Sequence, residues 1–225
     1  MQVIWKGQSC FQIIAKQEKN SQVSIVIDPF DGSIGLRAPS LEAEILLVSH
    51  HHSDHDNTKS VKGSPSQILE KLGRASPFLI EGPGEYEIKG IFIQGIPSFH
   101  DDSQGKERGV NTIYTIEAEE IRLCHLGDFG QKELTGEQLE KIGNCDILMI
   151  PVGGTYTIDS KIASNIISQI EPKIVIPMHF QIPKLSLKLE GVDKFLKIMG
   201  LKSVEPLSKL LIKKKDLPSE ETKII

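Results

Sequence analysis

Cysteine is scarce in this sequence of 225 residues, which contains three. Cys10, Cys124 and Cys145 lie far apart, and no two of them have the C-x-x-C spacing of a thiolate zinc site. Three scattered cysteines also make a poor disulfide framework. The cysteine content therefore indicates a reducing compartment, and we expect a cytoplasmic protein.

Long hydrophobic runs are missing as well. No segment approaches the roughly 20 consecutive apolar residues that a membrane-spanning helix needs. The N-terminal stretch at residues 1–17 alternates, and it places Lys6 where a signal peptide requires an unbroken apolar core. The sequence thus predicts no association with a membrane.

Aromatic residues and basic clusters are few. Aromatic residues make up 5% of the chain, the net charge is -4, and the longest basic run is IKKKD. Nucleic-acid-binding proteins carry basic surfaces and stacking aromatic side chains, so nucleic acid is an unexpected partner. A content of 39% hydrophobic and 25% charged residues fits one globular domain over residues 1–225.

Strand signals dominate the first half of the sequence. The apolar run ILLVSH at residues 45–50 is typical of a strand covered on both faces. Ser64 as N-cap and Gly73 just past the end predict one helix between them. Runs rich in β-branched and aromatic residues predict further strands at residues 2–7, 10–16, 22–30, 78–82, 86–99 and 111–128, the last with a hairpin turn at EAEE.

Helices and strands alternate in the second half. Thr135 and Gln138 form a capping box for a helix at residues 136–142, and the isoleucines at residues 160–170 lie near one helical face. Strands are expected at residues 146–152 and 173–180, a last helix at 191–200, and a linker-like terminus at 213–225. Strand-rich segments beside helices predict two stacked sheets covered by helices, an α/β (α+β) four-layer sandwich.

Histidines gather at the end of the apolar run. Four of the seven histidines fall within HHHSDH, residues 50–55. Residues two apart in an extended segment project to the same side, so His50 and His52 can converge on one point while Asp54 and His55 reach a neighbouring one. Imidazole and carboxylate are ligands of divalent metal ions, and one short loop can therefore serve two ions.

This segment resembles the H-x-H-x-D-H signature of the metallo-β-lactamase superfamily. Later segments match in order and spacing: IPSFHDD offers His100, LCHLGDFG offers Asp128, and IVIPMHF offers His179. The resemblance implies an αββα sandwich in which His50, His52 and His100 hold one metal ion. It also implies that Asp54, His55 and His179 hold the other ion and that Asp128 bridges the two.

The start of the chain resembles one branch of that superfamily. WKGQSCF is similar to the opening of small zinc-dependent hydrolases that include the L-ascorbate-6-phosphate lactonase relatives. Gln8 stands where that branch usually has histidine, so the resemblance does not carry a substrate over to this chain.

Several polar residues near these motifs have more ordinary interpretations. A histidine-rich loop can be an incidental solvated tract. His51 points away from its neighbours and is expected to be a bystander. His125 and Asp28 are candidates for orienting the ligands rather than binding metal, although strand-end capping explains Asp28 equally well. Ser9 and Cys10 lack an evident base partner, which disfavours a covalent mechanism.

The donor set predicts hydrolytic chemistry. Water bound to zinc has a pKa of about 7, which supplies a hydroxide nucleophile at neutral pH, with Asp54 as its positioning group and proton carrier. Two divalent ions, two aspartates and one hydroxide leave a charge of about +1, which favours a small anionic substrate. We expect cleavage of a small ester or lactone with two zinc ions, or manganese or iron. Phosphodiester or nuclease-type hydrolysis and a non-catalytic metal-binding or sensing role are the alternatives.

Overall fold

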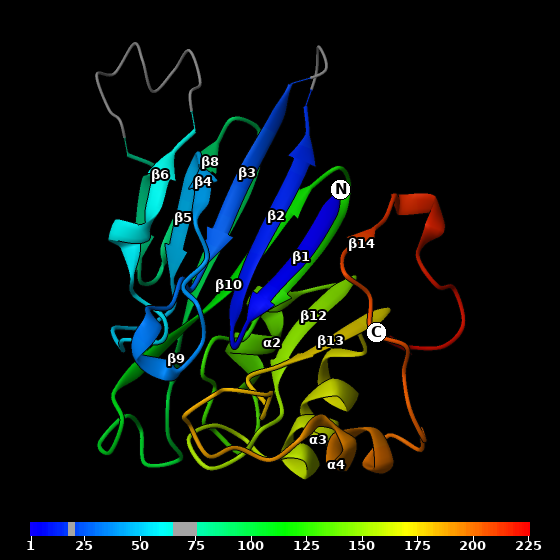
Figure 1. Cartoon of the computed structure of the whole chain (residues 1–225). Helices are drawn as coiled ribbons and strands as arrows, with labels where there is room; N and C mark the ends of the chain where they lie inside the picture. The colour runs from blue at the N-terminus through cyan, green and yellow to red at the C-terminus, as the bar shows by residue number, and fades with distance from the viewer. Residues whose placement is uncertain (18–20, 65–75) are drawn as a thin grey trace.

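The computed structural model describes residues 1–17, 21–64 and 76–225. The helix expected between Ser64 and Gly73 therefore lies outside the described residues. Two large sheets stack face to face (Figure 1). The first has six strands, in the spatial order β14 (Leu210–Leu211), β1 (Gln2–Gly7), β2 (Cys10–Lys16), β3 (Gln22–Ile27), β5 (Ile45–Val48) and β7 (Phe78–Glu81).

The second sheet has seven strands. Their spatial order is β15 (Lys223–Ile224), β13 (Ile174–Met178), β12 (Ile147–Pro151), β11 (Ile121–His125), β10 (Val110–Ala118), β9 (Ile91–Phe99) and β8 (Gly84–Ile88). The hairpin turn expected at EAEE is present, with Glu119 and Glu120 at φ angles of 53° and 62°. Pairing of Ala118 with Ile121 across this turn fixes the register of β10 and β11.

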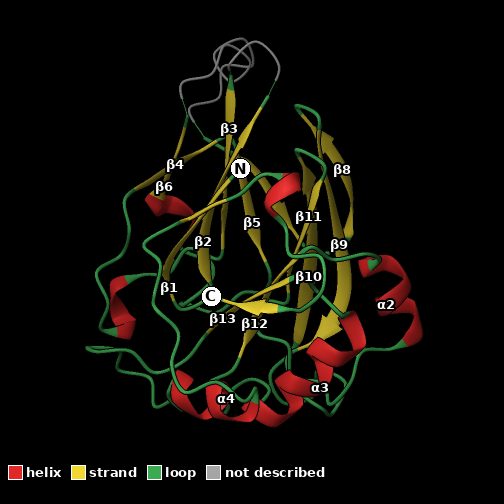
Figure 2. Ribbon diagram, turned by 90° about the vertical axis from the view of Figure 1, so that its right-hand side faces the viewer, coloured by secondary structure: helices red, strands yellow, loops and turns green. Residues whose placement is uncertain are grey.

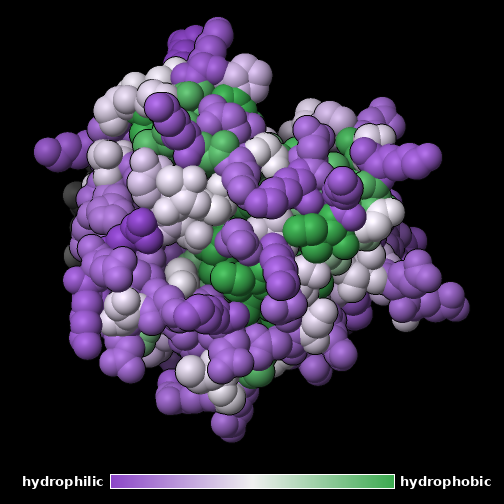
Figure 3. Space-filling view, turned by 90° about the horizontal axis from the view of Figure 1, so that it is seen from below, coloured by the Kyte–Doolittle hydropathy of each residue, from purple (hydrophilic) through white to green (hydrophobic). Residues whose placement is uncertain are grey.

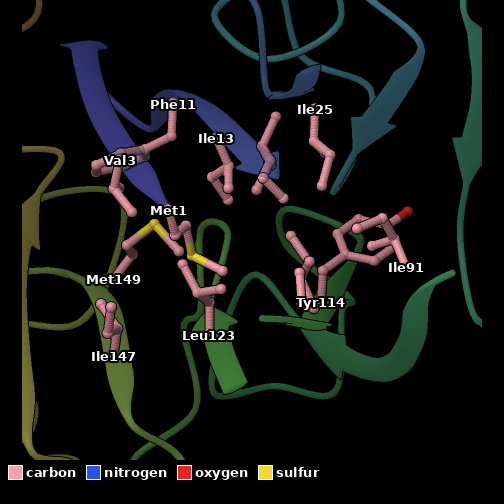
Figure 4. Packing of buried hydrophobic residues seen from close by; sticks show 14 of the residues in the cluster. Met1, Val3, Phe11, Ile13, Ile25, Ile91, Tyr114, Leu123, Ile147 and Met149 are labelled. Atoms are coloured by element: carbon pink, nitrogen blue, oxygen red, sulfur yellow. The ribbon is translucent and has the colours of Figure 1, made fainter. Parts of the chain in front are cut away.

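The main hydrophobic core lies between the two sheets. Figure 4 shows Val3, Phe11 and Ile13 from the first sheet facing Leu123 and Met149 from the second. Tyr114 is the largest fully buried side chain among the described residues, and its hydroxyl donates to Val48 O at 2.8 Å. This bond crosses from β10 to the end of β5, so it fixes the start of the histidine-rich segment against the opposite sheet.

Helices cover the outer face of the second sheet (Figure 2). They are α2 (Gly136–Ile142), α3 (Ser160–Ile170) and α4 (Val192–Ile198). Thr135 accepts a bond from the Gln138 backbone and its own N–H donates to the Gln138 side chain, which confirms the expected capping box. Alternate outward residues of the sheet, such as Leu148 and Val175, pack against Ile166 of α3.

The outer face of the first sheet is covered differently. There the short strands β4 (Leu41–Ala43) and β6 (Val61–Gly63) and the 3-10 turn at Gly32–Ile34 pack with Phe30 and Leu185. Two further 3-10 turns span Thr58–Ser60 and Lys214–Asp216. The expected α/β sandwich of two stacked sheets is confirmed, with α-helices on the outer face of the second sheet. Within the described ranges, no helix is long and apolar enough to cross a membrane.

The terminus expected to be linker-like is partly structured. β15 adds to the edge of the second sheet in parallel with β13, with Lys223 opposite Ile174. The short run TKII has little strand signal of its own, and the backbone of the β13 edge supplies the hydrogen-bonding partner that it lacks in isolation.

The strand directions bring several segments to one end of the sandwich. In the first sheet β1, β3 and β5 run in the same direction, and in the second sheet β9, β11, β12 and β13 do so. The β1–β2 turn and the carboxyl ends of these strands meet at the lower end of the molecule in Figure 1. Loops from both sheets therefore surround one location.

Candidate metal centre

Three histidines form the first group of candidate ligands at this end. His50 and His52 follow β5, and His100 follows β9 of the other sheet. One ring nitrogen from each lies within 4.8 Å of the others, and His50 Nε2 is 3.1 Å from His52 Nδ1. His50 and His100 are buried whereas His52 is exposed, so this group opens to solvent on the His52 side.

Four residues form the second group. Asp54 and His55 belong to the same loop as His50, Asp128 follows β11, and His179 follows β13. One ligand atom from each lies within 4.8 Å of the others. The Asp54 side chain is 15% exposed and the other three are nearly or fully buried, which makes Asp54 the solvent-facing member of the group.

Asp128 lies between the two groups. Its Oδ2 is 3.3 Å from His100 Nε2 of the first group and 3.3 Å from His179 Nε2 of the second, and its Oδ1 is 3.3 Å from His55 Nε2. The backbone N–H of Asp128 donates to Asn111 Oδ1 at 3.0 Å. The carboxylate is thus held where it can serve both groups at once.

Asp28 organises two of the histidines through a short hydrogen-bond chain. Its Oδ2 accepts bonds from the Ser49 hydroxyl at 2.6 Å and from His55 Nδ1 at 2.9 Å. Because the Ser49 hydroxyl donates its proton to Asp28, it can only accept from His50 Nδ1, 3.0 Å away. Asp28 therefore orients one histidine of each group and leaves both Nε2 atoms facing the site.

His125 is engaged with the backbone through both ring nitrogens. The Gly127 N–H donates to Nδ1 at 3.1 Å, so Nε2 carries the proton and donates to Ser9 O at 2.9 Å. Burial is the main cause that lowers the pKa of His125, which keeps the ring neutral. This histidine supports the β1–β2 turn beneath the site and has no free nitrogen for a metal ion.

The remaining residues singled out in the sequence lie as follows. The His51 side chain is 68% exposed and 3.6 Å from Asp56, on the outer side of the loop. Cys10 is buried, and burial followed by the charge of Asp28 raises the pKa of its thiol, so it is not an activated nucleophile. The Ser9 hydroxyl donates to Asp128 Oδ1 at 3.4 Å and supports that carboxylate.

The local electrostatics favour a cation. Burial alone would lower the pKa of His55, but Asp128, Asp54 and Asp28 outweigh it and raise that pKa well above its ordinary value. By contrast, burial and the neighbouring His55 lower the pKa of His50 to about 3, so His50 is neutral. The three carboxylates around the buried His55 ring stabilise a positive charge there, and a divalent ion can supply that charge in place of a proton.

A buried nitrogen atom without a hydrogen-bond partner also indicates that these residues can bind a metal ion. His55 Nε2 is buried without a hydrogen-bond partner although it faces Asp54 and Asp128. An unpaired buried polar atom is costly, and coordination to a metal ion would remove this cost. The donor set of imidazole and carboxylate suits zinc, manganese or iron, so the residues present fit metal binding.

Three supporting residues were not identified from the sequence. Ser49 connects Asp28 with His50, and Asn111 holds the Asp128 loop while its amide donates to Ser98 and to Leu126 O. Gly127 has a φ of 57°, and a Cβ there would lie 2.3 Å from Asn111 Oδ1. No spacing rule links these positions, because each acts through a contact between separate strands.

The chain is similar to known metal-dependent hydrolases. The family model described as the Beta-lactamase superfamily domain matches residues 2–179. A metal-dependent hydrolase from Thermococcus onnurineus is 28% identical over 198 residues, which cover 80% of this chain and 84% of the relative. One from Lawsonia intracellularis is 29% identical over 219 residues, covering 88% and 91%.

A solved structure extends the likeness over nearly the whole chain. It is described as a Zn-dependent hydrolase of the metallo-β-lactamase superfamily from Thermotoga maritima. The two chains are 33% identical and superpose with a TM-score of 0.74, covering 99% of this chain and 96% of the other. The chain therefore belongs to the metallo-β-lactamase superfamily and is one of its metal-dependent hydrolases.

Proposed function

We propose that this protein cleaves a small ester or lactone with two divalent metal ions, zinc in the first instance. His50, His52 and His100 would hold one ion, and Asp54, His55 and His179 the other, with Asp128 shared. The observation that carries this proposal is the position of Asp128, whose Oδ2 is 3.3 Å from a histidine of each group. A carboxylate between two sets of nitrogen donors is the arrangement that a dinuclear centre requires.

When bound, the two ions would generate a hydroxide from water near neutral pH and polarise the oxygen of the bond to be cleaved. The protein contributes the proton handling. Asp54 is the solvent-facing carboxylate of the centre, 3.5 Å from His55 Nε2 and 3.8 Å from His179 Nε2. From that position it can orient the nucleophile and later carry its proton to the leaving group.

The test begins with metal analysis and a substrate panel. Protein prepared without chelator should contain close to two ions per chain, and it should be screened on chromogenic carboxylic esters, lactones, thioesters and phosphodiesters. Activity on carboxylic esters or lactones that disappears with chelator and returns with zinc supports the proposal. Turnover confined to phosphodiesters, or a stoichiometry that stays at one ion after zinc addition, contradicts it.

The role of Asp54 has its own test. We expect Asp54→Asn to lower kcat by roughly 10²- to 10⁴-fold with little change in KM, because it removes a group that acts on the proton. The wild-type rate should rise with pH through a value near 7 as the bound water ionises. Metal content must be measured for each variant, since loss of one ion would also lower kcat.

Asp56→Asn is the matched control for Asp54. Asp56 lies two residues away and is directed towards the exposed His51 at 3.6 Å. It should retain wild-type kcat and metal content. Equal losses in the two variants would show that the negative charge of the loop, and not the position of Asp54, supports turnover.

A further inference from the structure

Arg108 lies at the point where the β9–β10 connection returns to the candidate metal centre. The connection leaves β9 at His100, and the His100 N–H donates to Gly109 O at 3.1 Å. Arg108 is the residue before Gly109 in sequence. The base of its side chain is therefore fixed beside a candidate ligand of the first group.

Asp101 holds the whole connection in place. Its buried carboxylate accepts four backbone N–H bonds of 2.7–3.0 Å, from Ser103, Gly105, Glu107 and Arg108. A carboxylate that gathers several N–H groups fixes the course of a loop more firmly than neutral contacts would. The Arg108 backbone thus occupies one position relative to His100.

The Arg108 guanidinium crosses to the loop after β12. Its Nη2 donates to Thr155 O at 3.2 Å, and its Cζ lies 5.8 Å from the centre of the Tyr156 ring. The same loop packs directly on His179, because a Cβ at Gly153 would lie 2.1 Å from His179 O. Arg108 therefore links the backbone beside His100 to the loop whose Gly153 contacts the His179 backbone.

The backbone at the receiving end is strained. Thr155 has a φ of 60°, a left-handed conformation that a β-branched residue rarely adopts. Strain of this kind persists where the surrounding structure requires it. Here it directs the Thr155 carbonyl to the guanidinium.

The guanidinium of Arg108 has no carboxylate partner among residues 1–17, 21–64 and 76–225. Within the described ranges, the partners of its guanidinium are the Thr155 carbonyl and the Tyr156 ring, and neither is a carboxylate. The residue is exposed, and a guanidinium has five N–H donors, most of which remain available here. The face seen from below in Figure 3 is mainly hydrophilic, with hydrophobic patches between polar side chains.

We infer that Arg108 is a specificity-determining residue, which binds an anionic carboxylate or phosphate group of the substrate at the edge of the metal centre. This inference rests on the proposed hydrolase function. Guanidinium groups match the planar oxygen pairs of carboxylates and phosphates, and a pre-positioned one loses little freedom on binding. The contacted group would be remote from the bond that is cleaved.

The kinetic test uses three esters that share one scissile bond. One is neutral, one carries a remote carboxylate, and one carries a remote phosphate. We expect Arg108→Gln to raise KM for the anionic esters by roughly 10- to 100-fold, with kcat and the neutral ester unchanged. Arg108→Lys should recover part of the loss, because it restores charge without the planar pair of donors.

The control removes an equal charge nearby. Lys132 is exposed and already paired with Asp102, so Lys132→Gln should leave every KM unchanged. The two anionic esters also show which anion Arg108 prefers, because the larger rise in KM in Arg108→Gln identifies the carboxylate or the phosphate as the preferred group. An Arg108→Gln effect that is equal for neutral and anionic esters overturns the inference.

A binding measurement separates this inference from the proposed function. Benzoate, phenyl phosphate and benzyl alcohol are titrated into the metal-loaded wild type and the Arg108→Gln variant, and calorimetry measures the affinity of each. We expect weaker binding of at least one anion to the variant and equal binding of the alcohol. If the wild type hydrolyses none of the esters, the proposed function fails while this titration still decides on Arg108. Equal anion affinities in the two proteins contradict the inference.

Discussion

Asp128 differs from Asp54 because its oxygens lie 3.3 Å from histidines of both ligand groups, His100 of the first and His55 and His179 of the second. Its pKa is held well below the ordinary value, since the neighbouring His179 and His55 outweigh the effect of burial. An ionised, fully buried carboxylate is stable only while positive charge surrounds it. We therefore propose that Asp128 makes metal binding by the two groups mutually dependent.

Substitution of Asp128 should reveal this dependence. We expect Asp128→Ala to lower metal content from near two ions per chain to one or fewer, because it removes an oxygen donor from both groups. His51→Ala, in the same histidine-rich loop, is the control: its ring is 68% exposed and directed towards Asp56, so metal content should be unchanged. Elemental analysis measures both, and equal losses would mean that the inner and outer faces of the loop are wrongly assigned.

At the scale of an element, Asp101 stabilises the β9–β10 connection, because four of its backbone N–H groups donate to the Asp101 carboxylate. Burial alone would raise its pKa, but the four backbone N–H donors outweigh burial and lower the pKa from 3.8 to about 2. The charged form is therefore the one that stabilises the connection. This contribution is fully present above the ordinary pKa of the group and is lost as the pH falls through about 2.

Asp101→Asn should destabilise the protein at neutral pH by about 1–3 kcal/mol, because an amide cannot accept from four N–H groups at once. Chemical denaturation measured from pH 7 down to pH 2 checks the sign: the difference between wild type and variant should shrink as the pH falls. Asp102→Asn removes the next carboxylate in sequence, which is paired with Lys132 near the surface, and should cost much less. A difference that grows towards low pH would contradict the assignment.

At the scale of the whole molecule, the candidate metal centre connects the two sheets. His50, His52 and His55 follow a strand of the first sheet, whereas His100, Asp128 and His179 follow strands of the second. Ions bound between them would act as cross-links that only the folded chain can form. Metal binding should therefore contribute directly to the free energy of unfolding.

Removal of metal should lower thermal stability. With free metal at a thousand times its dissociation constant, binding adds about 4 kcal/mol, which corresponds to a shift of roughly 10 °C in Tm for a chain of this size. Scanning calorimetry with and without chelator measures the shift, and added zinc should reverse it. Asp128→Ala should show a much smaller response to chelator. An unchanged wild-type Tm after verified metal removal would exclude a cross-linking role for the centre.

The sequence by itself determined the local elements and the identity of the candidate ligands. Apolar runs at β5, β12 and β13 marked buried strands, because a strand covered on both faces needs continuous hydrophobic residues. The capping box at Thr135 could also be predicted from the sequence, because Thr135 and Gln138 lie within one helical turn of each other. Four candidate donors, His50, His52, Asp54 and His55, could be picked out from their spacing in HHHSDH, and the resemblance to the superfamily signature then implied His100, Asp128 and His179.

Only the tertiary structure decided how these elements meet. The order of strands within each sheet, the addition of β15 to the β13 edge, and the contacts of Asp28 with Ser49 and His55 depend on neighbours that are distant in sequence. Arg108 carries no motif, and its relation to Thr155 exists because two loops converge at one end of the sandwich. A local sequence pattern predicts whether a residue is buried, caps a helix or offers a metal ligand. The packing of the whole chain determines which distant residue it contacts.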